Sequence, residues 1–123
     1  MAETSISLAG NLTSDPELHH SPGGVARVTF RVAVSSRVRD GEQWRDGEPA
    51  FYTVVVWRDQ AEHAAKSLAK GSRAVVVGRL AQRSWQADDG SNRSVVEVVA
   101  DELGPSLRWA TAAPARITKN GGA

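Results

Sequence analysis

Aromatic and arginine side chains recur at alternate positions in two apolar segments of this 123-residue chain. Phe51 and Trp57 have the same parity within residues 51–57, so both side chains would lie on one face of an extended strand. Four residues of the segment 72–85 share a parity in the same way: Arg73, Arg79, Arg83 and Trp85. Exposed rings stack on unpaired bases and guanidinium groups bind phosphates, so such a face is typical of a surface for single-stranded nucleic acid.

A structural interpretation competes with this one, because a single tryptophan is more often part of a core or of a subunit contact. The combination of several rings with matched arginines favours binding. Two further residues are candidates for the same surface. Arg31 lies on the polar face of the alternating segment 25–34, and Trp44 lies at the centre of a polar hairpin loop over residues 39–49.

The distribution of charge is more informative than its total. The formal net charge is only +1, from 15 basic and 14 acidic residues. Residues 27–83, however, hold eleven basic and six acidic residues, an excess of five positive charges. Twelve of the fifteen cations are arginine, which suits phosphate binding and stacking on bases.

No catalytic, metal or cofactor site is expected. The chain has no cysteine, and its three histidines, His19, His20 and His63, are divided between an expected turn and an expected helix surface. Asp88 and Asp89 precede Gly90, where a turn explains them. No apolar run is long enough to cross a membrane and no secretory signal opens the chain, so we expect a cytoplasmic protein. We expect it not to be an enzyme, because no catalytic constellation is found, and to be nucleoid-associated, because of its expected nucleic-acid surface.

The apolar pattern predicts strands that must position these residues, together with one helix. The expected strands are residues 4–12, 25–34, 51–57, 72–85 and 93–99, with a further extended segment at 106–111. Asp59 is expected to cap the helix, with Glu62 completing a capping box, and Gly71 to end it. Gly78 indicates a bend or a bulge. This order is compatible with a small Greek-key barrel of the oligonucleotide-binding type or with a small sandwich.

The chain also resembles a known family, the bacterial single-stranded DNA-binding proteins. Residues 10–18 (GNLTSDPEL) are similar to the opening segment of the family, and residues 51–57 with Ala61-Glu62 are similar to its central strand and helix start. Further matches follow in order, at Lys70-Gly71-Ser72, Gly78-Arg79-Leu80, Arg83, Trp85, Gly90, Arg93 and Glu97-Val98-Val99. The resemblance covers roughly residues 4–110.

The resemblance implies an all-β fold: a five-stranded Greek-key OB-fold barrel with one short helix and an extra C-terminal strand at a subunit contact. It implies a homotetramer that binds single-stranded DNA without sequence preference in replication, repair and recombination. The base-stacking rings of the family fall on Phe51, Trp57 and Trp85. With Trp44 and the arginines at 31, 73, 79 and 83, they form the expected nucleic-acid-binding set.

Residues 1–111 are expected to form the binding domain and residues 112–123 a short flexible tail. That tail holds two cations and no acidic or aromatic residue, whereas the family recruits partners through an acidic tail that ends in phenylalanine. We therefore expect few tail-mediated protein partners. Two alternatives keep the fold: an adaptor or RNA-binding paralogue, and a structural paralogue that assembles with a fuller homologue.

Overall fold

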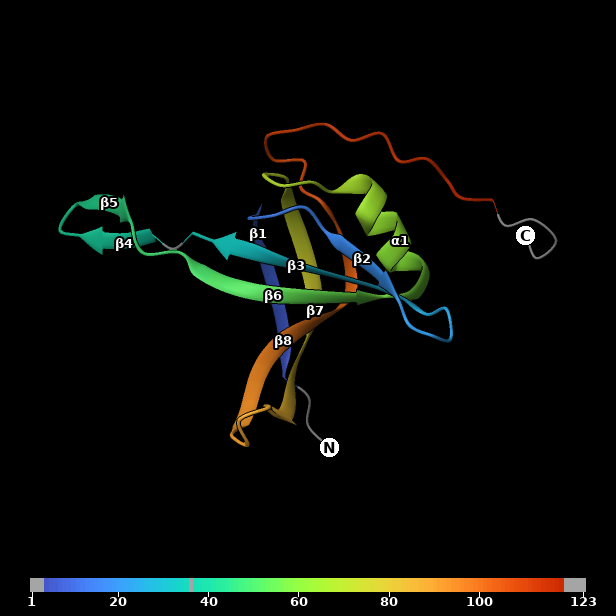
Figure 1. The fold of residues 1–123 in the computed structure, drawn as a ribbon. Helices are drawn as coiled ribbons and strands as arrows, with labels where there is room; N and C mark the ends of the chain where they lie inside the picture. Colours follow the sequence, from blue (N-terminus) through green and yellow to red (C-terminus); the bar gives the residue numbers. More distant parts are fainter. Residues whose placement is uncertain (1–3, 36, 119–123) are drawn as a thin grey trace.

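The computed structural model describes residues 4–35 and 37–118, which form short and long strands with one helix packed beside them (Figure 1). The elements in chain order are β1 (Ser5–Leu12), β2 (Glu17–His20), β3 (Ala26–Val34), β4 (Arg37–Asp40), β5 (Gln43–Asp46), β6 (Ala50–Trp57), α1 (Arg58–Ser67), β7 (Arg73–Gln86) and β8 (Asn92–Pro105). Within this described part, no helix has the length and apolar character needed to cross a lipid bilayer.

Five of the strands pair in a closed ring in the order β1-β7-β8-β6-β3. The ring closes where β1 meets β3, through the pairs Asn11↔Ala33 and Leu12↔Val32. The β6–β8 ladder is parallel and the other four ladders are antiparallel. This arrangement is the five-stranded barrel of the oligonucleotide-binding fold, with the helix between its third and fourth strands. The barrel that the family resemblance implied is therefore confirmed, and the sandwich that the sequence pattern left open is excluded.

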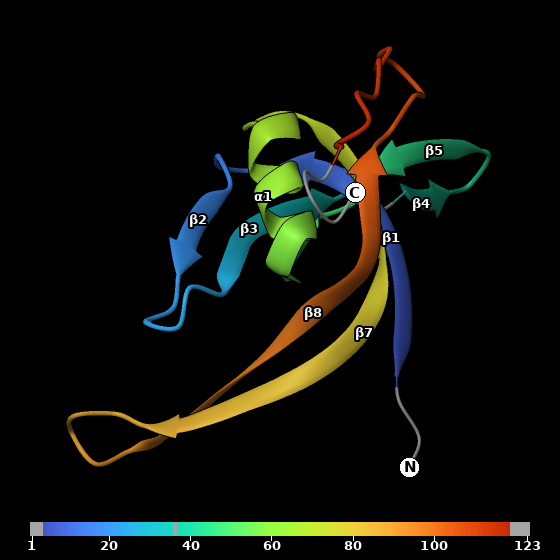
Figure 2. The same ribbon diagram turned by 90° about the vertical axis from the view of Figure 1, so that its right-hand side faces the viewer.

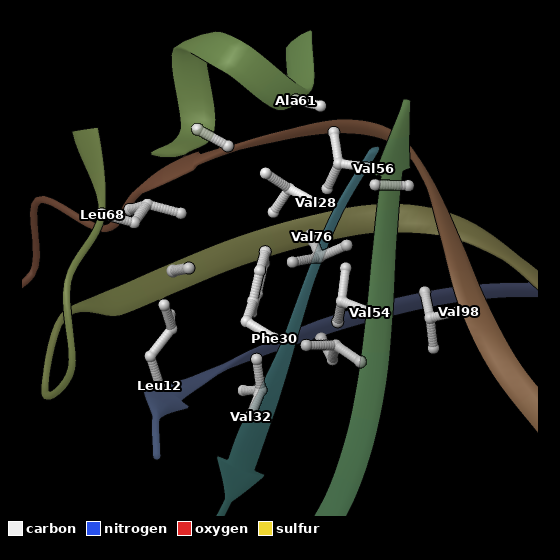
Figure 3. Close-up of a cluster of buried hydrophobic side chains, with 14 of the residues drawn as sticks. Leu12, Val28, Phe30, Val32, Val54, Val56, Ala61, Leu68, Val76 and Val98 are labelled. Carbon is white, nitrogen blue, oxygen red and sulfur yellow. The ribbon is translucent and has the colours of Figure 1, made fainter. Parts of the chain in front are cut away.

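Alternate side chains of the strands fill the barrel interior (Figure 3). Val28, Phe30 and Val32 of β3 are buried, and Arg27 and Arg31, at the alternate positions of this strand, lie on the opposite face. One side of α1 covers the core with its expected apolar stripe, in which Ala61 and Ala64 are buried. Each fully buried valine contributes about 1.5–3 kcal/mol relative to an exposed one, so this interior holds the outer face in place.

Two long strands, β7 and β8, form a curved hairpin that extends well beyond the barrel body (Figure 2). Val77 pairs with Glu102, but Gly78 pairs with Ala100, so Asp101 is an extra residue in β8. A side chain at Gly78 would collide with the carbonyl oxygen of Val99. The bulge expected near Gly78 is confirmed, with its extra residue in the partner strand. The alternation of β7 is therefore uninterrupted.

The predicted helix boundaries are wrong at both ends. The helix begins at Arg58, its N-cap is Trp57, and no side chain caps it. Asp59 thus lies inside the first turn, where its negative charge still favours the helix. The helix ends at Ser67 because Leu68 takes an extended conformation that buries its side chain. Gly71, at a φ of 88°, belongs instead to the turn into β7.

The predicted break at Gly104-Pro105 is also wrong. These residues do not end the last strand early, because β8 continues through Pro105 opposite Ala74. Residues 106–118 contain no strand: after the bond from the Ser106 N–H to the Arg73 carbonyl, the chain turns, and the Arg108 N–H bonds to the Ser106 hydroxyl. Within the single chain this segment pairs with no strand, and its pairing with another subunit, which the family resemblance implies, stays a prediction. Residues 119–123 of the expected tail lie outside the described part.

The region around His19 and His20 differs from expectation as well. These residues belong to the exposed edge strand β2, which pairs with β3 through His19↔Arg27 and His20↔Ala26, and not to a turn. The polar segment before β6 forms the expected hairpin, β4–β5, which extends away from the barrel body (Figure 1).

Candidate nucleic-acid interface

The outer face of β6 and β3 carries two half-exposed rings, each with a guanidinium group above it. Trp57 lies directly opposite Arg27 in the antiparallel ladder, and the Arg27 guanidinium carbon is 5.6 Å from the centre of the indole ring. The Arg31 guanidinium carbon lies 4.6 Å from the centre of the Phe51 ring. Cations at these distances are attracted by the negative faces of the rings. The alternation of each strand places the four side chains on one surface.

The β7–β8 hairpin carries a third half-exposed ring, Trp85, with Arg83 beside it at 4.8 Å. Here the arginines also have carboxylate partners. Arg83 Nε donates to Glu97 Oε1 at 3.3 Å, and Arg79 Nη1 donates to Asp101 Oδ1 at 2.6 Å. The guanidinium groups of β7 are therefore held by the neighbouring strand β8.

A groove of about 300 Å³ joins the two regions. Its lining comes from four strands and consists of Arg27, Val55, Trp57, Arg83, Glu97 and Val99. Val55 and Val99 are neighbours in the parallel β6–β8 ladder and form an apolar floor. The tip of the hairpin has a second hollow of about 380 Å³, lined by Gln82, Ser84, Trp85, Asn92, Arg93 and Ser94. The groove thus brings together residues that are far apart in the sequence.

Several members of the expected set lie on the outer face of the barrel and the β7–β8 hairpin: Phe51, Trp57, Trp85, Arg31 and Arg83. Arg79 lies four residues before Arg83 on the same face of β7, nearer the barrel. Trp44 lies instead on the β4–β5 hairpin, where it is exposed. Arg73 lies at the start of β7, ten residues before Arg83 and so roughly 33 Å along the strand. Its guanidinium carbon is 4.9 Å from the Trp109 ring, which Arg108 also approaches at 4.7 Å.

Sequence reasoning missed two groove residues. Arg27 shares the parity of Arg31 in a clean alternating strand, and this signal could have identified it. Glu97 had no comparable signal, because an acidic residue within an apolar run does not show which strand will pair with it. Among the described residues, Glu97 is nevertheless the charged residue that is buried, with only 9% of its surface exposed.

The other titratable groups of the described residues are exposed or half-buried. His19 lies 3.7 Å from Glu17, and His20 lies 3.9 Å from Glu62, as surface pairs that contribute little to stability. Within residues 4–35 and 37–118, no group of three or more metal-ligating side chains is close enough to hold an ion. At the hairpin tip, hydrogen bonds from the Ser91 hydroxyl and N–H lower the pKa of Asp89 below its usual value.

The barrel and its ring-lined groove define an oligonucleotide-binding-fold protein with a surface suited to an unpaired nucleic-acid strand. Residues 3–106 match the single-strand binding protein family. The chain belongs to this family.

Relatives match almost the whole chain. The single-stranded DNA-binding protein of Mycobacterium tuberculosis H37Rv is 46% identical over 122 residues, which cover 98% of this chain and 74% of the relative. That of Mycolicibacterium smegmatis is 48% identical over 121 residues, covering 97% and 73%. Among solved structures, a small single-stranded DNA-binding protein from Streptomyces coelicolor matches with a TM-score of 0.72 and 36% identity, covering 87% of this chain and 97% of that one.

Proposed function

We propose that this protein binds single-stranded DNA without a required sequence, and that it acts by binding and not by catalysis. The observation that carries the proposal is the pairing of every ring on the outer face with a guanidinium group: Phe51 with Arg31, Trp57 with Arg27, and Trp85 with Arg83. The names of its relatives, which describe single-stranded DNA-binding proteins, support the same function.

In the proposed mechanism, unstacked bases lie on the rings, and the sugar-phosphate backbone of the DNA runs alongside the arginine side chains. Each base has a π-face that an aromatic ring can cover, whatever its hydrogen-bonding edge, so stacking needs no particular sequence. A duplex hides these faces within its own stack and gains nothing from exposed rings. Phe51 and Trp57 are six residues apart on β6, roughly 20 Å, so one strand of DNA contacts both only in an extended form.

The proposed biological role is the protection of single strands during replication, repair and recombination in the bacterial cytoplasm. The unit that performs it is proposed to be a homotetramer. Two features support self-association. The outer side of β1 from Ser5 to Gly10 has no strand partner within the described chain. Next to it on β7, Val75 and Val77 are both more than 40% exposed, and exposed apolar side chains beside an open strand edge favour pairing with another copy.

A fluorescence titration tests the binding proposal. Trp57 and Trp85 should be quenched as an oligo-dT strand is added, because stacked bases quench indole emission. A duplex of the same length should give much weaker binding. A matched oligo-rU strand separates DNA from RNA binding. Equal affinity for duplex and single strand would overturn the proposal, and tighter binding of RNA would favour the RNA-binding alternative.

Sedimentation velocity tests the assembly. The full chain should sediment as a tetramer, and Val77→Lys should shift it to smaller species because the lysine places a charge on the proposed contact. Val96→Lys is the control, since Val96 is also exposed but lies on the hairpin away from β1. A monomeric wild-type chain, or equal dissociation by both variants, would contradict this assembly.

A further inference from the structure

A carboxylate lines the groove between Trp57 and Arg83, although the proposed ligand is a polyanion. It belongs to Glu97 of β8, whose side chain is only 11% exposed. The carboxylates of Asp101 and Asp89, in other arginine pairs of the β7–β8 hairpin, are more than half exposed. A charge with so little exposure is weakly screened by salt, so a phosphate that enters the groove would meet its repulsion at short range.

Glu97 and Arg83 neutralise each other across the β7–β8 ladder. Glu97 lies opposite Ala81, two residues from Arg83 on the same face of β7, so the two charged side chains are diagonal neighbours. Arg83 Nε donates to Glu97 Oε1 at 3.3 Å. A cation contributes to counterion release on DNA only while its charge is uncompensated. In this state, therefore, Arg83 adds little to the binding of a phosphate.

We propose that Glu97 restrains the affinity of the protein for DNA: by neutralising Arg83, it removes a phosphate contact that the groove otherwise has the cation to make. The inference rests on the proposed function and concerns how tightly a strand is bound, whatever its sequence. Stacking is left intact, because Trp57 in the groove and Trp85 beside Arg83 need only their ring faces to hold a base. The DNA backbone is then held less firmly over β7 and β8 than over β3 and β6.

Glu97→Gln tests the restraint, because glutamine keeps the shape of the side chain and an oxygen for the Arg83 Nε–H but carries no charge. The measurement is the association constant of a short oligo-dT strand, about eight nucleotides long, at several salt concentrations. One added phosphate contact should steepen the slope of log affinity against log salt by about 0.7. If the variant and the wild type bind equally at about 1 M salt, the variant should bind about threefold more tightly at about 0.2 M and about eightfold more tightly at about 0.05 M.

Asp88→Asn is the matched control for the change in total charge. Asp88 is an exposed carboxylate at the tip of the same hairpin, and among the described residues no arginine pairs with it. This variant gains the same charge as Glu97→Gln but frees no arginine, so its slope should match that of the wild type. In the double variant Arg83→Gln/Glu97→Gln, the gain in slope should disappear, because the arginine that the single variant frees is absent.

An unchanged or shallower slope in folded Glu97→Gln would overturn the proposal. An equal gain in Asp88→Asn, or a gain that persists without Arg83, would overturn it too. Failure of the wild-type chain to bind oligo-dT would instead overturn the proposed function. Thermal melting checks the fold of each variant. If Glu97→Gln does not fold, Glu97→Met replaces it: methionine has a similar volume and no charge, the half-exposed Arg83 can be hydrated, and the slope should steepen in the same way.

Discussion

The outer face carries arginines from β3 and from β7, and the two groups differ in whether a carboxylate neutralises their charge. Arg27 and Arg31 lie over the rings of Trp57 and Phe51, and among the described residues neither has a carboxylate within ion-pair distance. Arg79 and Arg83 are bound to Asp101 and Glu97. A guanidinium group on a ring keeps its full charge for a phosphate, whereas one paired with a carboxylate must first lose that partner.

The comparison divides the surface by task. The β3–β6 region combines stacking rings with available cations and is suited to both bases and backbone. The β7–β8 region combines a ring with arginines whose charges are neutralised by carboxylates of β8, and it is suited to bases. Position on the outer face is therefore not enough to assign an arginine to a phosphate, because the strand that pairs with it decides whether its charge is available.

The largest effects are expected from the stacking rings, which are present in both regions. Phe51→Ala, Trp57→Ala and Trp85→Ala should each weaken single-strand binding by about 1–3 kcal/mol, the usual contribution of one stacked base. The rings are 43–49% exposed, so their removal should leave the fold intact. Titration checks the affinity, and circular dichroism with thermal melting checks the fold. Three folded variants with wild-type affinity would show that these rings have no part in binding.

The next effect separates charge from stacking in the β3–β6 region. Arg27→Gln and Arg31→Gln should each reduce the slope of log affinity against log salt by about 0.7, because each removes one phosphate contact. Affinity should fall alike for all sequences. Titrations at several salt concentrations provide the measurement. Arg27→Lys, which keeps the charge, is the control and should retain the wild-type slope.

A paired replacement in the β7–β8 region should have almost no effect. The double variant Arg79→Gln/Asp101→Asn removes both charges of the 2.6 Å ion pair and leaves the net charge of the region unchanged. We expect wild-type affinity and salt slope, because the pair presents no free cation to the DNA. A fall in slope comparable to that of Arg27→Gln would contradict the proposed division. Arg79 would then contact phosphate, as the sequence pattern alone indicates.

The smallest expected effect concerns the turn that supports the Trp85 hairpin. Two hydrogen bonds from Ser91 stabilise the ionised form of Asp89 and lower its pKa in the folded state. Their stabilising contribution is therefore present above the unfolded-state pKa and is lost as pH falls through the folded-state value. An NMR titration of the Asp89 carboxyl carbon should give a midpoint below the usual value for an aspartate. In Ser91→Ala, which removes the hydroxyl donor, the midpoint should rise toward that value.

Much of this protein followed from its sequence. Strict alternation in residues 26–34 determined both a strand and its faces, because an apolar-in, polar-out pattern of period two buries well only when extended. The same reasoning placed Phe51 and Trp57 on one face of their strand, and the family resemblance assigned these two rings and Trp85 to the outer, base-stacking face. The apolar stripe of α1 was also predictable, since helical spacing brings Ala61, Ala64 and Leu68 to one side.

The ends of the last strand and of the helix depended on contacts between residues far apart in the sequence, which a local sequence pattern does not show. Gly104-Pro105 looked like a strand end, yet these residues pair with Val75 and Ala74 at the other end of the hairpin. Proline fits there because it is the last residue of β8. The helix ended at Ser67 and not at Gly71 because burial of Leu68 in the core outweighed continuation of the helix.

The sequence by itself determined which side chains share a face of a strand; only the tertiary structure decided which of them meet. Arg27 lies over Trp57 through the register of β3 on β6, and Glu97 reaches Arg83 through the register of β8 on β7. A strand shows its own alternation but not its partner or its register, which the packing of the whole barrel selects. For this reason the rings could be identified from the chain alone, while the difference between a free arginine and a paired one could not.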